Sequence, residues 1–300
     1  MRVIGLDIGF GQVKVITGEG KLKFPSQIAQ FIPDGISDVE YVEHNSMLYV
    51  VGDSASAFRQ KFSLSTAQQL IKYAPVLLKH ALKKAGLEKE KTLIVSGLPP
   101  RFKNLAEEFE GALRQVEGVE SVMIVPQGVG IVEDTKTRIF QYPNALVLDI
   151  GFNTVDYISL SVSGDKLIKE RSGTIEGLGV KSAAEIFRTL LPPEVGYYRN
   201  EPYVFLVPIL IKGSVHIGGK EINLESIKQK ALRAWSEQIN LRLTEEIGEL
   251  IKSKFLFVVG GGGAYFLDRD VFERDVYVPF EPDFSNARGY YKIGLMKAVR

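Results

Sequence analysis

The sequence contains no cysteine, and its only histidines are His44, His80 and His216. Without cysteine, disulfide bonds, thiolate catalysis and cysteine-based zinc sites are excluded. The three histidines lie far apart along the chain, so we do not expect a histidine metal site. No run of 18 or more apolar residues occurs, and a chain without one is not expected to form a transmembrane helix.

An excess of charge of one sign is also missing. The formal net charge is +1, and the lysines and arginines are scattered rather than grouped in blocks. Proteins that hold nucleic acids by neutralising phosphates usually carry a basic stripe, so no direct contact with nucleic acid is expected. Residues 1–7 read as a strand rather than as a signal peptide. We therefore expect a cytoplasmic protein with no membrane partner.

What is present is the composition of a globular protein. Hydrophobic residues make up 45% of the 300 positions and charged residues 24%. A chain of this length can form two domains of ordinary size and can bury a substantial core.

An internal repeat organises the chain. Residues 6–13 read LDIGFGQV and residues 148–155 read LDIGFNTV. Each copy follows an apolar run and precedes an alternating stretch, which predicts a strand, a tight glycine turn and a second strand. Because the copies lie nearly half a chain length apart, we predict two similar domains, each opened by the same β-hairpin.

Hydrophobic periodicity predicts the elements between these landmarks. Short strands are expected within 22–53, and a helix over 65–86 with Ser65 as N-cap, Gly86 as its stop and a kink or break at Pro75. Strands and helices mixed along the whole chain indicate an α/β fold. The further predicted helices cover 105–116, 182–191 and 227–251, and the further predicted strands cover 92–96, 122–125, 204–211, 214–217 and 255–259.

The first hairpin has the parts of a phosphate site. Its glycines, Gly9 and Gly11, permit a tight turn whose successive N–H groups can bind an anion. Lys14 could add a positive charge. Asp7 would repel a phosphate unless a cation lay between them, and Mg²⁺ prefers oxygen ligands and keeps several waters. Asp7 is therefore interpreted as holding magnesium through water.

The second hairpin offers the same parts at Asp149, Gly151, Asn153 and Thr154. Two facing copies would clamp a polyphosphate from both sides. A third glycine-rich segment, Gly260–Gly263, follows an apolar run and could let a flat ligand lie against the backbone. It is neither a phosphate-binding loop with Gly-Lys-Ser/Thr nor a dinucleotide fingerprint.

Together these segments resemble the actin, Hsp70 and sugar-kinase superfamily, which is recognised by five ordered elements. The chain looks closest to ParM-like bacterial and archaeal actins, because of its opening residues 4–14, Phe24-Pro25-Ser26, and Gly177 to Val180 before a helix. The five elements match residues 7–12 and 149–154 as phosphate loops, 125–130 and 286–290 as interdomain connections, and 260–263 as the adenosine loop.

The resemblance implies an actin-like α/β fold of two RNase-H-like domains, with a nucleotide cleft between them and small inserted subdomains. We place the domains at 1–142, with an insertion at about 24–90, and at 143–300, with an insertion at about 176–252. It further implies a slow Mg²⁺-dependent hydrolase of ATP or GTP. Such proteins form head-to-tail filaments of self, and a DNA-binding adaptor can link them to plasmid segregation.

Site residues follow from the same resemblance. Gln127 matches the residue that orients the attacking water, and Asp7 and Asp149 match the magnesium-facing aspartates. Lys181, Glu185 and Lys228 lie where family members approach the ribose and base, although a solvated helix face explains these three equally well. The other predicted nucleotide contacts are Gly9, Phe10, Gly11, Gln12, Lys14, Gly151, Asn153, Thr154, Gly177, Gly260, Gly261, Gly262 and Gly263.

Two other functions remain open on this fold. A small-molecule kinase would need a carboxylate base near the γ-phosphate, and Asp156 could be proposed for that role. A non-polymerising scaffold would bind nucleotide and a membrane partner, usually through an amphipathic terminal helix, which neither terminus clearly shows.

Overall fold

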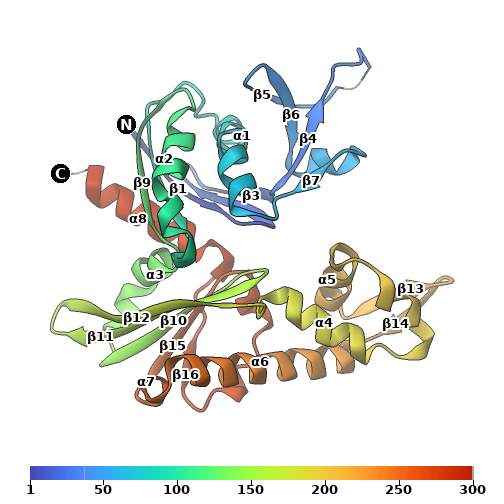
Figure 1. Cartoon of the computed structure of the whole chain (residues 1–300), viewed down its shortest axis with the longest axis vertical. Coiled ribbons are helices and arrows are strands. Elements are labelled where there is room, and N and C mark those ends of the chain that lie inside the picture. Colours follow the sequence, from blue (N-terminus) through green and yellow to red (C-terminus); the bar gives the residue numbers. More distant parts are fainter. Residues whose placement is uncertain (37, 299–300) are drawn as a thin grey trace. The chain divides into compact units, whose positions relative to one another are not determined.

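The computed structural model describes residues 1–36 and 38–298. Contacts between Cα atoms divide the chain into two compact units. Unit 1 comprises Met1–Lys136 together with the C-terminal residues from Asp283 onwards, and unit 2 comprises Thr137–Pro282. Each unit contains one five-stranded sheet, and each is described below by itself (Figure 1).

The sheet of unit 1 has the order β3-β2-β1-β8-β9. The first three strands form an antiparallel meander, and β8 and β9 continue the sheet in parallel with β1. The meander contains the hairpin predicted from residues 6–13, which is confirmed. The strands are β1 (Arg2–Ile8), β2 (Gln12–Ile16), β3 (Lys21–Pro25), β8 (Thr92–Leu98) and β9 (Val119–Pro126).

Helices cover both faces of this sheet. Ile4 and Ile94 pack with the apolar residues of α1 (Ala67–Ala85) and α2 (Ala106–Arg114). The neighbouring strand residue Val3 points to the other face and packs against Tyr290 of α8 (Ser285–Ala298), as alternation along a strand requires. The backbone of α8 lies directly on β1, because a Cβ at Gly5 would come within 2.0 Å of the Ala287 carbonyl oxygen.

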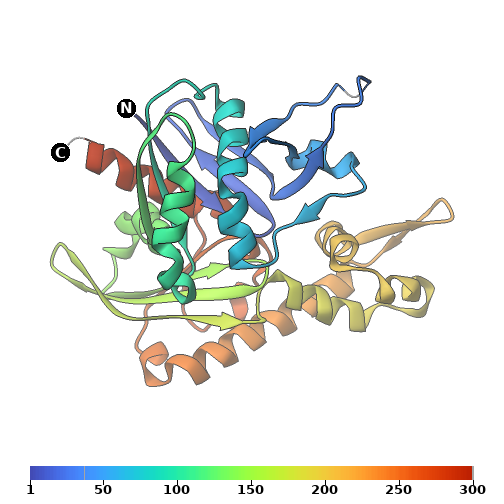
Figure 2. The ribbon, with the colours of Figure 1, turned by 45° about the horizontal axis from the view of Figure 1, so that its top comes forward.

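Unit 1 also carries a separate antiparallel sheet of order β5-β6-β4-β7. It accounts for the short strands predicted within 22–53. In Figure 2, which is turned relative to Figure 1, these strands are the blue arrows to the right of the cyan helix α1. The strands are β4 (Gln27–Phe31), β5 (Val42–His44), β6 (Met47–Val51) and β7 (Phe62–Ser63), and the unit's 3-10 helices begin with η1 (Gly52–Ala57) and η2 (Pro100–Leu105).

Helix α1 confirms the predicted helix but corrects two of its details. The N-cap is Thr66 rather than Ser65, because the Thr66 side chain accepts from the Gln69 N–H. Ser65 instead donates its own N–H to the Gln69 side chain, which completes a reciprocal capping arrangement. Pro75 does not split the helix, which is continuous to a left-handed Gly86. Pro75 is one of the buried residues of this helix.

Unit 2 repeats the same sheet order as β12-β11-β10-β15-β16. The second predicted hairpin joins β10 to β11, and β15 and β16 run parallel to β10. The equivalence of the two sheets explains the sequence repeat. The strands are β10 (Asn144–Ile150), β11 (Thr154–Ser163), β12 (Lys166–Glu176), β15 (Leu256–Gly260) and β16 (Asp275–Tyr277), with a separate hairpin of β13 (Ser214–Ile217) and β14 (Lys220–Asn223).

The core of unit 2 is formed by the sheet, α4 (Val180–Leu190) and α6 (Glu225–Ile247), which lie side by side in both views (Figures 1 and 2). Trp235 of α6 is fully buried there, and its indole N–H donates to the Leu178 carbonyl at 3.0 Å. The long helix predicted to 251 stops at Gly248, whose φ of +62° ends α6 before the short α7 (Glu249–Lys252).

The strand predicted over 204–211 is wrong, because these residues belong to helix α5 (Tyr203–Lys212). A continuous apolar run does not separate a strand from a buried helix by periodicity alone. The burial decides it here, since Leu206 and Leu210, one turn apart, are fully buried while Phe205 is exposed. A left-handed Gly213 ends the helix, and this stop signal is visible in the sequence.

Two helices had no predicted counterpart. One is α3 (Val129–Ile139), and the other is α8. The C-terminal residues, placed in the second domain by the sequence, lie in unit 1 because α8 packs on β1 and β8. The first segment of unit 1 ends at Lys136, before the predicted domain boundary after residue 142. The remaining 3-10 helices are η3 (Pro193–Asn200), η4 (Gly262–Phe266), η5 (Arg269–Val271) and η6 (Pro282–Phe284).

Among the residues that the structure describes, no helix combines the length and the apolar character needed to cross a membrane. The cytoplasmic location stays a prediction from the sequence.

His80 is a titratable group in the core of unit 1 whose charge state should affect stability. His80 of α1 is buried against the edge of the Phe24 ring. Burial lowers the pKa of His80 to about 4 from 6.5, although the nearby Glu40 opposes the change. The unfolded chain binds this proton and the folded chain does not, so stability should fall as the pH drops from 6.5 towards 4.

We expect the free energy of unfolding to lose at most roughly 3 kcal/mol over this pH range through His80. His80→Met removes the titration and retains an apolar side chain of similar size. Urea unfolding of both proteins between pH 7.5 and 4.5 measures the effect. Equal pH slopes in the two proteins would contradict it.

Candidate functional site

The turn of the first hairpin is held by hydrogen bonds from Ser26. Gly9 donates its N–H to the Gln12 carbonyl at 3.0 Å, and the Ser26 N–H donates to the Gly11 carbonyl at 3.0 Å. The Ser26 hydroxyl donates to the Gly9 carbonyl at 2.6 Å. Ser26 is completely buried. These bonds use the carbonyl groups of Gly9 and Gly11. A Cβ at Gly11 would meet nothing within 4 Å.

Asp7, at the end of β1, is a buried carboxylate that is only partly neutralised. The Lys14 ammonium lies 3.7 Å from its Oδ2, while Oδ1 is buried and has no hydrogen-bond partner among the described residues. Burial raises the pKa of Asp7, against the opposing effect of Lys14. A buried acidic oxygen without a partner is costly in free energy, and a cation or its bound water would satisfy it. The residues at this position therefore fit a magnesium ion.

A row of charges extends from Asp7 across the meander. Asp7 pairs with Lys14 on β2, and Lys14 is directly opposite Lys23 on β3. The Lys23 ammonium donates to Asp283 at 3.1 Å, and the charge of Asp283 in turn raises the pKa of Asp7. Like charges facing each other across strands repel, so the two lysines need the two carboxylates. The sequence reasoning missed Lys23 and Asp283, since the long chain separation between them carries no local signal.

Gln127 lies in the turn between β9 and α3. Its N–H donates to the Leu98 carbonyl at 2.7 Å. The following Gly128 has a φ of +88°, which glycine adopts readily, and donates its N–H to the Asn286 side chain at 3.1 Å. Gln127 is thus in unit 1 with Asp7, and its main chain is fixed on both sides.

The second hairpin packs against the start of α4. Gly151 donates its N–H to the Thr154 carbonyl at 2.9 Å, as Gly9 does to Gln12 in the first. Gly177 donates to the Asn153 carbonyl at 3.0 Å, and the Lys181 N–H donates to the Phe152 carbonyl at 2.9 Å. The structure therefore brings together the predicted residues Gly151, Asn153, Thr154 and Gly177 with the first turn of α4.

The glycine run lies against the same hairpin. Gly260 on β15 is the parallel partner of Asp149 on β10. A Cβ at Gly261, where φ is +81°, would come within 2.5 Å of the Asp149 carboxylate, and a Cβ at Gly263 within 2.2 Å of Ile150. These two glycines are required by packing within unit 2. At Gly262 a Cβ would meet nothing within 4 Å, so this position, unlike Gly261 and Gly263, is open to a ligand.

The three predicted base-flanking residues are engaged with α5. The Lys181 ammonium lies 4.8 Å from the centre of the Tyr203 ring, and the Tyr203 hydroxyl donates to Glu185. Lys228 donates to the Ile211 carbonyl at 3.1 Å, near the end of α5, and contacts Glu225 at 3.3 Å. Each therefore has a structural role in this subregion, and a nucleotide contact by any of them stays a prediction.

Asp156, the residue that a kinase would use as a base, is buried on β11 opposite Asp149 and accepts a hydrogen bond from Thr174. Within residues 1–36 and 38–298 no three acidic, histidine or cysteine side chains are grouped as metal ligands. Asp7 and Asp149 occupy equivalent positions at the ends of β1 and β10, each next to its turn.

Comparison with known proteins agrees with this arrangement. A family model for the N-terminal domain of actin-like proteins matches residues 5–130, and one for the C-terminal domain of archaeal MreB-like actin homologues matches residues 147–273. Archaeal actin homologues from Thermoplasma acidophilum and Thermoplasma volcanium are each 26% identical to this chain, over 97% of its length and 98% of theirs.

Solved structures show the same fold. The crystal structure of an archaeal actin homologue superposes with a TM-score of 0.80 at 20% identity, covering 99% of this chain and 100% of that one. The same homologue has been solved in complex with ADP, with a TM-score of 0.78. ParM from a 15-stranded Clostridium botulinum filament superposes with a TM-score of 0.79 at 21% identity, covering 98% of this chain and 99% of that one.

The twin sheets, each opened by an aspartate-bearing hairpin, therefore define a protein of the actin fold. Since the two family models together span most of the sequence, the chain belongs to the actin-like proteins. The predicted family and fold class are confirmed.

Proposed function

We propose that this protein binds ATP or GTP with Mg²⁺, hydrolyses the nucleotide slowly, and uses it to control assembly into filaments of self. The observation that carries the proposal is the pair of equivalent hairpins, each with a buried aspartate at the strand end and a glycine turn beside it. The ADP complex of the archaeal homologue and the ParM filament support it. We also propose that units 1 and 2 correspond to the two domains predicted from the sequence, with α8 moved from the second domain to the first.

In this proposal each residue of the site has a separate task. Asp7 and Asp149 hold the waters of the metal, and Lys14 offers a positive charge to the phosphates. When bound, magnesium neutralises phosphate charge and polarises the terminal phosphoryl group. Gln127 has an amide side chain that can orient an attacking water but cannot accept a full proton, which agrees with slow hydrolysis.

Light scattering and phosphate release after addition of ATP or GTP with Mg²⁺ test the proposal directly. We expect scattering to rise with nucleotide and to decay as phosphate appears. Nucleoside diphosphate formed only when a sugar is added, with the phosphoryl group on the sugar and no free phosphate released, would instead identify a kinase. Binding with neither turnover nor scattering would identify a scaffold. A DNA-segregation or other cytoskeletal role, through an adaptor that binds DNA, is proposed from the ParM resemblance.

Gln127→Ala is expected to slow hydrolysis by about 10- to 100-fold, because an unoriented water attacks poorly, while nucleotide binding stays intact. Phosphate release at saturating nucleotide and calorimetric affinity measure the two effects. An unchanged turnover rate would remove Gln127 from the site.

Gly262→Ala is expected to weaken nucleotide binding without loss of folding. A methyl group at this open position would displace a ligand lying on the backbone, at about 1–3 kcal/mol, which is roughly 10- to 100-fold in affinity. Gly261→Ala is the matched comparison, since its Cβ would collide within unit 2 and lower the melting temperature. If Gly262→Ala binds nucleotide as the wild type does, the ligand does not lie against this glycine.

A further inference from the structure

Helices α3 and α8 are joined inside unit 1 at three successive points. At the first, the Gly128 N–H donates to Oδ1 of Asn286. At the second the two backbones touch, because a Cβ at Gly289 would lie 1.8 Å from the Gly130 carbonyl oxygen. The third point is Asp134, one turn further along α3. The three contact points run from the turn that contains Gln127 and Gly128 along α3 to Asp134.

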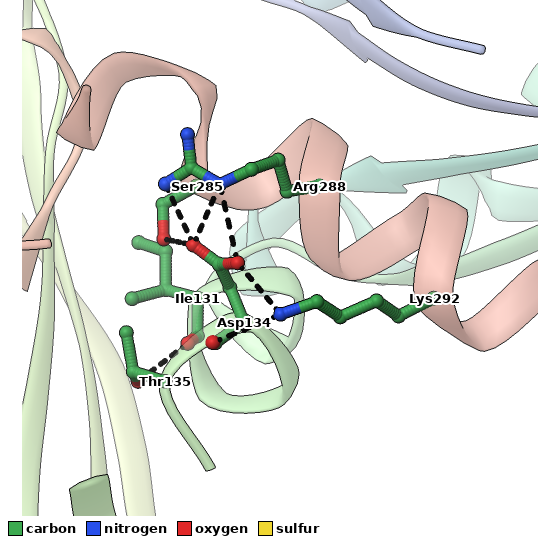
Figure 3. Close-up of polar contacts among 6 residues, drawn as sticks. All are labelled: Ile131, Asp134, Thr135, Ser285, Arg288 and Lys292. Carbon is green, nitrogen blue, oxygen red and sulfur yellow. Dashed lines mark hydrogen bonds and ion pairs between the residues drawn. The ribbon is translucent and has the colours of Figure 1, made fainter. Parts of the chain in front are cut away.

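Asp134 accepts hydrogen bonds from three side chains of α8 (Figure 3). The Ser285 hydroxyl donates at 2.7 Å, the Arg288 guanidinium at 2.8 Å and the Lys292 ammonium at 2.9 Å. The Asp134 side chain is only 6% exposed. Burial alone would raise the pKa of Asp134, but the bonds from Arg288, Ser285 and Lys292 outweigh burial and hold it below its usual range. The carboxylate is therefore ionised at neutral pH.

Stability alone is a weak reason for such a cluster. A buried ion pair often adds little net stability compared with apolar residues of the same volume, whereas it fixes geometry. The contact between Gly130 and Gly289 is close but has no side chains that would fix the register of the two helices. A planar guanidinium on a carboxylate has a defined direction, so Asp134 and Arg288 set how far along and around α3 the helix α8 sits.

The geometry that is fixed in this way belongs to Gln127. The peptide group before its Cα is held by the bond from its N–H to Leu98 of β8. The peptide group after its Cα is held by the bond from Gly128 to Asn286 of α8. Two fixed peptide planes fix the backbone dihedrals between them, and hence the direction of the Gln127 Cα–Cβ bond. One plane depends on the sheet, and the other depends on α8.

We propose that Asn286 is a positioning residue for Gln127, and that Asp134 keeps Asn286 in place through Ser285 and Arg288. The inference rests on the proposed role of Gln127 in nucleotide hydrolysis. It assigns to the first turn of α8 a function in the reaction, although α8 contributes no residue that contacts the reacting atoms in this proposal.

The test uses the full-length protein with Asn286→Ala, which removes the acceptor, and Asn286→Asp, which retains a side-chain oxygen at the same place. Glu133→Gln is the matched control, because Glu133 is the neighbour of Asp134 on α3 but forms no ion pair with α8 in the described part of the chain. Its ion pair is with Lys136, at 3.2 Å. Amide hydrogen exchange at Gly128, nucleotide affinity and phosphate release at saturating nucleotide are measured for each variant.

In Asn286→Ala we expect the Gly128 amide to exchange about tenfold faster or more, and phosphate release to slow by about tenfold or more, with nucleotide affinity unchanged. Asn286→Asp should restore slow exchange and most of the turnover, and Glu133→Gln should match the wild type. Asp134→Asn, which keeps the size of the side chain, should shift both quantities in the direction of Asn286→Ala.

The inference is overturned if Asn286→Ala leaves the Gly128 exchange or the turnover unchanged. Affinity and turnover falling together, without rescue by Asn286→Asp, would show that Asn286 is merely structural and would also overturn it. If the wild type releases no phosphate, the proposed function fails, and the exchange at Gly128 alone decides whether Asn286 holds this peptide.

Discussion

Changing Asp7 to Asn is expected to weaken the binding of a magnesium nucleotide by about 10- to 100-fold, the usual effect of removing a group that orients the ligands of a metal. Asp7 is 4% exposed, and one of its carboxylate oxygens has no hydrogen-bond partner in the described part of the chain. An amide of the same size preserves the packing but carries no negative charge for a metal-bound water. Binding measured in EDTA should change much less.

The same carboxylate should make binding depend on pH. Burial raises the pKa of Asp7 above the ordinary 3.8, so the folded, nucleotide-free protein takes up this proton at a higher pH than a free aspartate would. Ionised Asp7 is the form that a metal requires. Affinity should therefore fall as the pH drops through the raised pKa, and by linkage the contribution of Asp7 to nucleotide-free stability falls as the pH rises through it.

Calorimetry with and without Mg²⁺ at several pH values separates these effects. Asp7→Asn should remove the Asp7 part of the pH dependence, and Asp165→Asn, at an exposed turn between β11 and β12, should behave as the wild type. If Asp7→Asn retained both the affinity and the response to magnesium, Asp7 would not be at the metal.

Gly289→Ala should have the largest effect on folding. The added Cβ would lie 1.8 Å from the Gly130 carbonyl oxygen, and both partners of this collision are backbone, which cannot turn aside as a side chain can. We expect a loss of about 3 kcal/mol, at the upper end of the range for overpacking, and a melting temperature lower by roughly 10 °C.

Gly111→Ala provides the opposite result in the same unit. Gly111 is in the interior of α2, and a Cβ there would meet nothing within 4 Å. Replacing a helical glycine with alanine should stabilise the protein by about 0.5–1 kcal/mol. Thermal unfolding of both variants measures the difference. A Gly289→Ala protein as stable as the wild type would mean that α3 and α8 are not in backbone contact.

Features that arise from neighbours in the sequence could be predicted. Glycine turns between apolar runs predicted the hairpins at Asp7 and Asp149. The spacing of apolar residues and the glycine at position 86 predicted the helix over 67–85. The apolar run 204–211 was misread because a continuous apolar run shows neither the alternation of a strand nor the period of an amphipathic helix. The glycines at 261 and 263 were read only as ligand contacts, while the structure shows that Asp149 and Ile150 fill the space beside them.

The sequence by itself determined the family, the repeat, and the two aspartates near the ends of equivalent strands. Each of these features depends on short motifs of a few consecutive residues. Only the tertiary structure decided that Asp283 pairs with Lys23, that Asn286 holds the peptide after Gln127, and that α8 belongs to unit 1. Those contacts join residues more than a hundred positions apart, and they form only when the packing of the sheets and helices brings the two segments of chain together.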